Sequence, residues 1–266
     1  EGLGDVKHYL EPFFGSGAVL LARPNFDPIT HLETICDKDG FVANVWRSLQ
    51  FAPDEVARWC DWPVNHADLN ARRKVLLAEK DDLLKHLSDD PSYYNSKLAG
   101  YWVWAASCWI GRGLTRPDAI PMLACTGKGV HKRGRIPQLS ASGMGVFALG
   151  TIPHLGNRGV HKKSLNNRNS GSCTTEDSRK SVQESYNANI YGWFRLLSER
   201  LRYVRVVCGD WTRICGGDWQ DTGGLAGIFF DPPYGVSDRD GVYEVDSSTV
   251  AASVRQWCIE GGQKPS

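Results

Sequence analysis

Apolar and polar positions along the chain follow two different spacings. Helical spacing predicts a helix over 41–49, whose apolar stripe consists of Val42, Val45, Trp46 and Leu49. The same criterion predicts helices over 66–88, 93–110, 187–201 and 247–260. Short apolar runs of strand length occupy 9–11, 33–37, 203–207 and 227–230. Because strands and helices alternate at both ends of the chain, we expect an α/β fold.

The stretch 111–181 does not continue this pattern. It is rich in Gly, Ser, Asn and basic side chains and has few apolar positions, which predicts long loops or partial disorder. Its basic residues form two clusters, which are Lys128, Lys132, Arg133 and Arg135, and then Arg158, Lys162, Lys163 and Arg168. Such clustering predicts a loop that follows a phosphate backbone. A solvated loop without a partner is the alternative.

Composition limits the classes of function. The chain has 266 residues and a net charge of +1, so attraction to nucleic acid has to come from local clusters. Its eight cysteines contain no Cys-x-x-Cys pair and no metal-ligand spacing with the seven histidines, which predicts free thiols in a reducing compartment and no metal. No apolar stretch approaches 18 residues and no signal-peptide pattern is present, so we expect a cytoplasmic protein that is not bound to a membrane.

A short polar motif closes the strand predicted at 227–230. Its residues are Asp231, Pro232, Pro233 and Tyr234. Because prolines lack N–H groups and have a restricted φ, the backbone must leave the sheet here with its carbonyls pointing outward. The carboxylate and a proline carbonyl can then accept hydrogen bonds from an exocyclic amino group, while the tyrosine stacks on the ring. An Asp-Pro turn that only ends a strand is the alternative.

A glycine turn follows the strand predicted at 9–11. The turn and the residue before it are Glu11, Pro12, Phe13, Phe14, Gly15, Ser16 and Gly17, and an apolar helix comes next. The two glycines let a backbone approach a ligand closely, and the start of the helix offers unpaired N–H groups. The next strand ends in Asp37, where an acid usually holds the hydroxyls of a nucleoside ribose. Alternatively, Asp37 caps the helix that begins at 41.

Together these motifs resemble the Dam-like DNA adenine methyltransferases, which use S-adenosylmethionine. The segment 11–17 is similar to the family's cofactor motif, and the segment 231–234 is similar to its catalytic motif. Asp37 matches the position that holds the cofactor ribose, and the strand that ends in Asp210 resembles the one whose acid lies near the cofactor adenine. The order of the two motifs, which are about 210 residues apart, resembles the alpha group of the family.

The resemblance implies a Rossmann-like methyltransferase domain formed by 1–60 and 185–266, with a helical, loop-rich target-recognition region over 61–184. It implies methyl transfer to N6 of an adenine that is flipped out of double-stranded DNA. Asp231 would contact the cofactor and, with the Pro232 carbonyl, orient the amine, while Pro233 fixes the turn and Tyr234 stacks on the base. Because the family's opening segment and closing strands have no counterpart here, we expect this domain to be incomplete at both ends.

Three alternatives stay open at this point. Methylation of the cytosine amine on the same fold usually goes with Ser at position 231, and methylation of RNA or protein amides usually goes with Asn there. The third alternative is a non-catalytic DNA-binding relic of such an enzyme. For the active enzyme, the resemblance implies a bacterial or phage-infected cell and DNA contacts by the two basic clusters.

Overall fold

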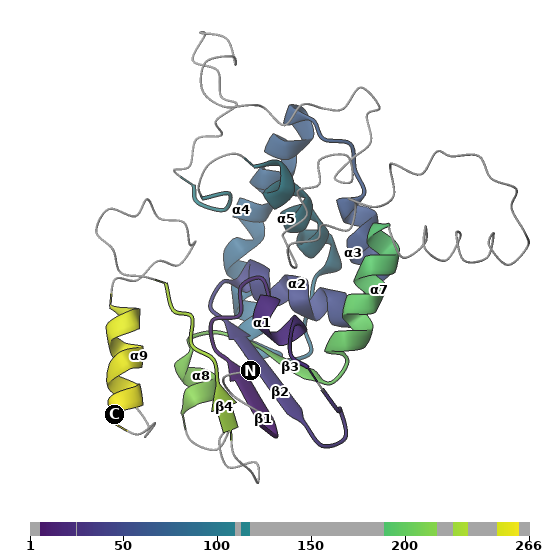
Figure 1. The fold of residues 1–266 in the computed structure, drawn as a ribbon. Helices are drawn as coiled ribbons and strands as arrows, with labels where there is room; N and C mark the ends of the chain where they lie inside the picture. Colours follow the sequence, from purple (N-terminus) through teal and green to yellow (C-terminus); the bar gives the residue numbers. More distant parts are fainter. Residues whose placement is uncertain are drawn as a thin grey trace, which may run out of the picture.

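The computed structural model describes residues 6–24, 26–109, 113–117, 189–216, 226–233 and 249–260. Its strands form one parallel sheet in the order β3-β2-β1-β4 (Figure 1). The strands are β1 (His8–Glu11), β2 (Leu32–Asp37), β3 (Val204–Cys208) and β4 (Ala226–Ile228). The prediction of an α/β fold is therefore confirmed, and the all-parallel order is compatible with a Rossmann-like fold.

Eight helices are described, five of which lie close to the ranges that the apolar spacing predicts. They are α1 (Ala18–Leu21), α2 (Gly40–Phe51), α3 (Pro53–Cys60), α4 (His66–Asp89), α5 (Ser96–Cys108), α7 (Ile190–Leu201), α8 (Thr212–Cys215) and α9 (Val250–Ile259). Side-chain caps fix the starts of α2, α4, α5 and α7, because each cap accepts a hydrogen bond from the first turn; the caps are Asp39, Asn65, Asn95 and Asn189.

The helix α3 was not predicted from the apolar spacing. Pro53 is its first residue, where the missing N–H removes no helical hydrogen bond. Val56, Ala57 and Cys60 are fully buried on one side of the helix. The helix is therefore held by its packing against α5 and α7 rather than by its length.

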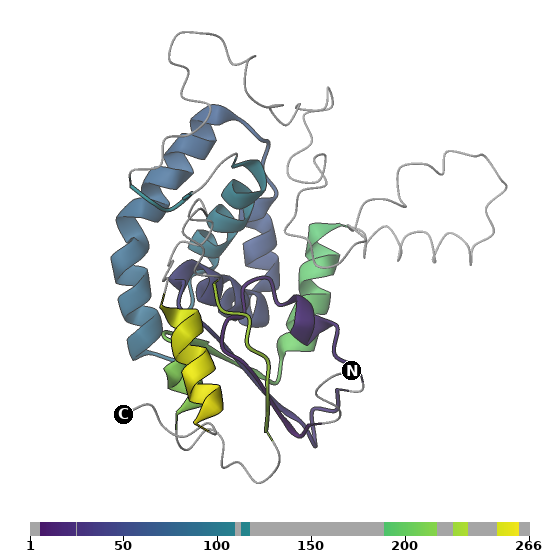
Figure 2. The same ribbon diagram turned by 60° about the vertical axis from the view of Figure 1, so that its left-hand side comes forward.

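Neighbouring residues of each strand belong to different cores. Tyr9 on β1 and Ile35 on β2 pack in a core with α2, α3, α5 and α7. Leu10 and Cys36, which point to the other face, pack in a second core with α8 and α9. Helices therefore cover both faces of the sheet, with α8 and α9 on one side and α2 and α7 on the other (Figures 1 and 2).

The sheet extends from β1 in two directions. β2 and β3 lie on one side of β1, whereas β4 lies on the other, with Leu10 opposite Ile228. The direction in which the sheet grows therefore reverses between β1 and β4. In open parallel sheets, ligands bind outside the carboxyl ends of the strands at such a reversal.

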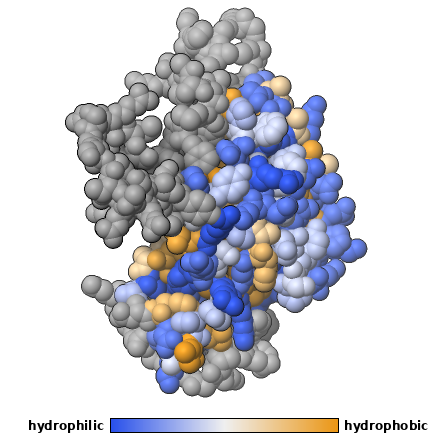
Figure 3. Space-filling view, turned by 90° about the vertical axis from the view of Figure 1, so that its right-hand side faces the viewer, coloured by the Kyte–Doolittle hydropathy of each residue, from blue (hydrophilic) through white to orange (hydrophobic). Residues whose placement is uncertain are grey.

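The side of the molecule formed by α3 and α7 is mainly hydrophilic, with isolated apolar residues (Figure 3). There Arg195 on α7 donates two hydrogen bonds to Asp54 on α3, at 2.6 and 2.8 Å. Because this ion pair is exposed, it contributes only about 0–1 kcal/mol. The buried side chains of Ile190, Phe194 and Leu197 hold α7 in place instead. None of the described helices combines the length with the apolar character that crossing a membrane requires.

Candidate active site

A pocket of about 400 Å³ opens at the carboxyl ends of the strands, where sheet growth reverses. Every described strand contributes to it. The residues after β1 and β2 that line it include Glu11, Pro12, Phe13, Phe14, Gly15, Ser16, Asp37, Lys38 and Asp39, and those after β3 and β4 include Asp210, Trp211, Phe229, Asp231 and Pro233. The structure thus brings together most of the residues that sequence analysis assigned to a site, although their segments are far apart in the chain.

The two glycines of the turn after β1 have different structural roles. Gly17, the residue before α1, has a φ of 68°, and an added Cβ would lie 2.6 Å from Phe14 Cζ. Gly17 does not line the pocket; it lets the turn close against the Phe14 ring. Gly15 also has a positive φ, of 50°, but an added Cβ there would meet no atom within 4 Å. Gly15 therefore presents its backbone to open space on the pocket side.

Asp37 joins the ends of two strands. Its Oδ2 accepts the Gly15 backbone N–H at 2.8 Å, and its Oδ1 accepts the Asp39 backbone N–H at 2.8 Å. Burial raises the pKa of Asp37, against the opposing effect of these backbone N–H groups. The alternative prediction that Asp37 caps the next helix is wrong, because Asp39 is the cap and accepts the Phe41 N–H at 2.8 Å.

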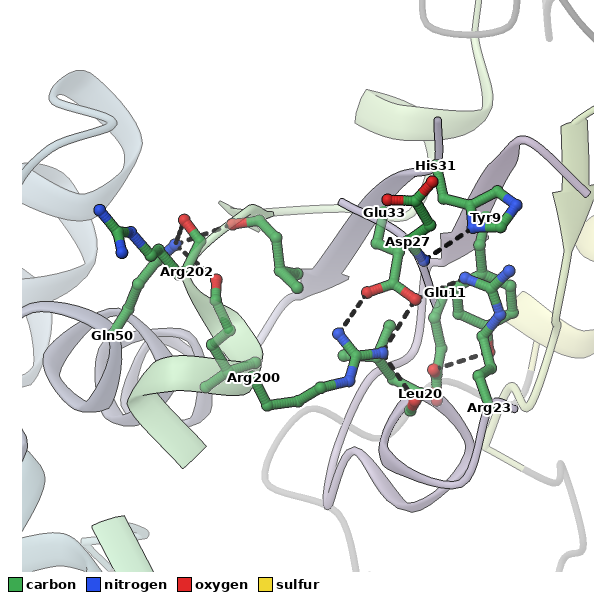
Figure 4. Close-up of polar contacts among 12 residues, drawn as sticks. Tyr9, Glu11, Leu20, Arg23, Asp27, His31, Glu33, Gln50, Arg200 and Arg202 are labelled. Atoms are coloured by element: carbon green, nitrogen blue, oxygen red, sulfur yellow. Dashed lines mark hydrogen bonds and ion pairs between the residues drawn. The ribbon is translucent and has the colours of Figure 1, made fainter. Parts of the chain in front are cut away.

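Glu11 is the most buried acid of the pocket lining, with 3% of its surface exposed. The Tyr9 hydroxyl donates to its Oε2 at 2.8 Å (Figure 4). Burial raises the pKa of Glu11 to about 7, although hydrogen bonds from Tyr9 and the Leu20 backbone N–H act in the opposite direction. The charges of Asp231 and Glu33 raise this pKa further. Glu11 can therefore gain or lose a proton near neutral pH.

A second buried acid, Glu33 on β2, lies near the pocket but does not line it. Its carboxylate lies between Arg23, which follows α1, and Arg200 on α7 (Figure 4). Arg200 donates to both carboxylate oxygens, at 2.6 and 2.9 Å, and a third hydrogen bond of 3.1 Å reaches the Leu20 carbonyl. The ion pairs neutralise Glu33 and fix α1, β2 and α7 to one another, although β2 and α7 are distant in sequence.

Aromatic rings form one wall of the pocket. The ring of Phe13 stacks on that of Trp211 with 6.5 Å between the ring centres. Trp211 is 94% buried and makes edge contacts with Phe230 and Trp257 in the core beneath. It therefore lines the pocket and packs the core at once. Trp219, the other tryptophan in this part of the sequence, lies outside the described residues.

Asp210 lies on the opposite side of the pocket from the β1–β4 edge, after β3. Its Oδ1 accepts the Thr212 hydroxyl at 3.0 Å, and its Oδ2 lies 3.3 Å from Lys38 Nζ. Lys38 and Asp39 were not predicted as lining residues, since a short turn between a strand and a helix gives no sign of which side chains face a pocket. Among the described residues, the lining contains five carboxyl side chains and a single cation, Lys38.

The catalytic motif predicted at 231–234 is described in part. Asp231 and Pro233 line the pocket, whereas Pro232 does not. Asp231 is exposed, and within the described part of the chain its carboxylate has no hydrogen bond or ion pair. Tyr234 lies outside the described residues, as do the predicted DNA contacts Lys128, Lys132, Arg133, Arg135, Arg158, Lys162 and Lys163.

Comparisons with known proteins identify no family for this chain. The sequence matches no protein-family model. A search of curated proteins finds no significant match either. Within the described ranges, no group of three or more His, Cys, Asp or Glu side chains is arranged to hold a metal ion. The chemistry of the pocket therefore has to be argued from its own residues.

Proposed function

We propose that the chain is an S-adenosylmethionine-dependent methyltransferase that acts on the N6 amine of adenine in double-stranded DNA. The observation that carries the proposal is the acidic lining of a pocket at the reversal point of a parallel sheet. Dinucleotides also bind at such points, but their pyrophosphate would lie among five carboxyl groups. Each close pair of a phosphate and a carboxylate would cost about 1–4 kcal/mol in electrostatic repulsion. A positively charged nucleoside such as S-adenosylmethionine avoids this repulsion.

The pocket residues fit such a nucleoside in shape as well as charge. Each carboxylate oxygen can accept two hydrogen bonds, so Asp37 keeps acceptor sites for ribose hydroxyls beside its bonds to Gly15 and Asp39. Phe13 and Trp211 offer flat surfaces to the adenine ring, and Asp210 can accept from its amino group. Gly15 leaves room for close approach of the ligand to the backbone.

The part of the proposal that concerns the methyl acceptor rests on Asp231, which is exposed and lines the pocket. When bound, S-adenosylmethionine supplies a methyl group on a good leaving group, so positioning can provide most of the rate. Asp231 and the Pro232 carbonyl would accept hydrogen bonds from the adenine amine and turn its lone pair toward the methyl group. Because an adenine inside a duplex cannot reach this pocket, the base has to be flipped out.

Two measurements test the proposal. In calorimetry, S-adenosylmethionine is expected to bind to the purified chain, while NAD is expected not to bind under the same conditions. With labelled methyl donor, label is expected in duplex DNA of mixed sequence and not in a duplex made only of G·C pairs. The second duplex is the matched control, because it offers the cytosine amine but no adenine.

The remaining outcomes correspond to the alternatives. Label in the G·C duplex would favour methylation of cytosine at N4. Binding of DNA without binding of the methyl donor would favour a non-catalytic relic. Binding of NAD in preference to S-adenosylmethionine would contradict the charge argument and with it the proposed function.

A further inference from the structure

Two acids of the pocket come from neighbouring strands. Glu11 is the last residue of β1, and Asp231 follows β4, one of the two strands that pair with β1. The Phe229 backbone N–H donates to the Leu10 carbonyl at 2.9 Å, so the pairing continues up to the residue beside Glu11. Both side chains line the same pocket, and the charge of Asp231 acts on Glu11. Their environments are opposite, since Glu11 is buried and Asp231 is exposed.

We propose that Glu11 and Asp231 act as one proton-accepting pair, which takes up the proton that the adenine amine loses when it is methylated. The inference deepens the proposed function and rests on it. Asp231 is the member that contacts the amine, and Glu11 is the member on which the proton rests. The two carboxylates are coupled through their charges, because the charge of Asp231 raises the pKa of Glu11.

The step balances in atoms and charge. The lone pair of the amine nitrogen forms the new N–C bond, while the C–S bond breaks and its electrons stay on sulfur. The nitrogen then carries the positive charge until one N–H proton moves to the carboxylate pair. The products are a neutral secondary amine, a neutral thioether and a pair that holds one proton. Before the step the positive charge is on sulfur and afterwards it is the proton, so the net charge of the pocket does not change.

Burial explains why the proton rests on Glu11. An ordinary glutamate has a pKa of 4.5 and would return the proton to water at neutral pH. The pKa of Glu11 is about 7, because the protein surrounds it. A cation in the pocket favours the ionised pair, which is the state needed before transfer. When the sulfonium becomes a neutral thioether, this cation is lost. Its loss favours the protonated pair, which is the state left after methyl transfer.

The other groups that face Glu11 do not replace it as an acceptor. The Tyr9 hydroxyl and the Leu20 backbone N–H are donors to its carboxylate. Glu33 on β2 is held by the two arginines Arg23 and Arg200. The remaining charged residues of the lining lie after β2 and β3, and they are Asp37, Lys38, Asp39 and Asp210. Among the described acids of the lining, Asp231 is the one whose charge raises the pKa of Glu11.

Proton release on ligand binding gives a test that does not depend on turnover. Calorimetry of S-adenosylmethionine binding to the full chain at pH 7, in two buffers of different ionisation enthalpy, counts the protons released. We expect about half a proton per site for the unmodified chain, because Glu11 is about half protonated at its own pKa. S-adenosylhomocysteine, which lacks the sulfonium charge, is expected to release much less. Glu11→Gln should abolish the release, and Glu79→Gln, an exposed change on α4, should leave it unchanged.

A second variant keeps the carboxyl group in case Glu11→Gln does not fold. Tyr9→Phe removes the hydroxyl that favours the ionised form of Glu11. Proton release should then reach its maximum at a higher pH than in the unmodified chain. A maximum at the same pH, or release that persists in Glu11→Gln, would overturn the proposed pair.

The pH dependence of kcat for methyl transfer provides a third test of the pair. In the unmodified chain kcat should fall about tenfold per pH unit below the pKa of Glu11, which is about 7, because protonated Glu11 accepts no further proton. Glu11→Gln should lower kcat and lose this inflection, with KM for the methyl donor changed less than kcat. An inflection that survives in Glu11→Gln would overturn the proposed proton-accepting pair but not the proposed function. Absence of methyl donor binding, or of transfer to DNA, in the unmodified chain refutes the proposed function and the inference with it.

Discussion

The Gly15 backbone N–H donates a 2.8 Å hydrogen bond to Asp37 Oδ2, so the carboxylate that ends β2 holds the glycine turn that follows β1. The two residues come from different strands, and both line the pocket. A change at Asp37 therefore acts on the ligand contacts and on the shape of the turn together.

Replacing Asp37 by Ala is expected to weaken S-adenosylmethionine binding by about 1–3 kcal/mol, because it removes an acceptor from the ribose and leaves the Gly15 N–H unpaired. Calorimetric titration measures the change. Asp89→Ala, at an exposed position of α4, is the matched control and should bind as the unmodified chain does. Equal affinity in both variants would exclude Asp37 from the ligand site.

The two glycines of the turn should respond differently to Ala. Gly17→Ala is expected to reduce the free energy of unfolding by about 2–3 kcal/mol, since it combines a positive φ with a clash against Phe14. Gly15→Ala meets no neighbouring atom and should cost about 1 kcal/mol, from its φ alone. Denaturant unfolding of the two variants side by side measures the difference. If Gly15→Ala were the more damaging, the description of the turn would be incorrect.

Asp231→Ala and Tyr234→Ala are expected to reduce methyl transfer to adenine strongly, while most of the affinity for the methyl donor remains. The reason is that Asp231 lines the pocket and that the family resemblance assigns Tyr234 to stacking on the base, so each change would remove an interaction with the reacting adenine. Single-turnover transfer of labelled methyl to DNA measures the rate, and calorimetry measures the binding. Transfer at the normal rate in Asp231→Ala would rule out the proposed mechanism.

The raised pKa of Glu11 predicts how stability depends on pH. The folded protein holds the Glu11 proton more tightly than the unfolded chain does, with a pKa of about 7 against an ordinary value of 4.5. The contribution of this group is therefore fully present below pH 4.5 and is lost as the pH rises through 7. The loss amounts to about 3 kcal/mol, and it should be absent in Glu11→Gln.

Urea unfolding between pH 4 and pH 8, compared among the unmodified chain, Glu11→Gln and Glu79→Gln, measures this contribution. Glu79→Gln has the same change of charge at an exposed site and should follow the unmodified chain. If the stability of Glu11→Gln kept the same pH dependence as that of the unmodified chain, the proton of Glu11 would not be linked to folding.

The two basic clusters predict a salt effect on DNA binding. Removing Lys128, Lys132, Arg133, Lys162 and Lys163 together should weaken binding to every duplex and reduce the slope of log affinity against log salt. Each phosphate contact contributes roughly 0.9 to that slope, so the reduction should reach about 4.5 if all five make contact. Binding to one duplex at several salt concentrations measures the slope for both proteins. An unchanged slope would place the DNA-binding surface elsewhere.

The strands and most helices could be predicted from the sequence because their signals are local. The alternation of Tyr9 with Leu10, and of Ile35 with Cys36, follows directly from the two faces of a sheet. The apolar stripe on α2 is equally local. The alternative that made Asp37 the cap of α2 lay two residues too early, since Asp37 and Asp39 are equivalent in type and only the position of the first helical turn distinguishes them.

The features that could not be predicted depend on contacts between distant segments. The partners of Glu33 include Arg200, which is 167 residues away, and no local pattern selects that pair. The pKa of Glu11 depends on burial by the surrounding elements, which the composition of its own segment does not reveal. The position of Lys38 beside Asp210 likewise depends on the pairing of β2 with β3.

The pairing of Leu10 with Ile228 has a consequence for synthesis of the protein. A ribosome adds about 5–20 residues per second, so β4 leaves it roughly ten to forty seconds after β1. Throughout that interval, the edge of β1 that later receives β4 has unpaired N–H and C=O groups, which can pair with any exposed strand. We expect the nascent chain to depend on chaperones during this interval, and we expect truncations that remove residues 226–228 to aggregate rather than fold.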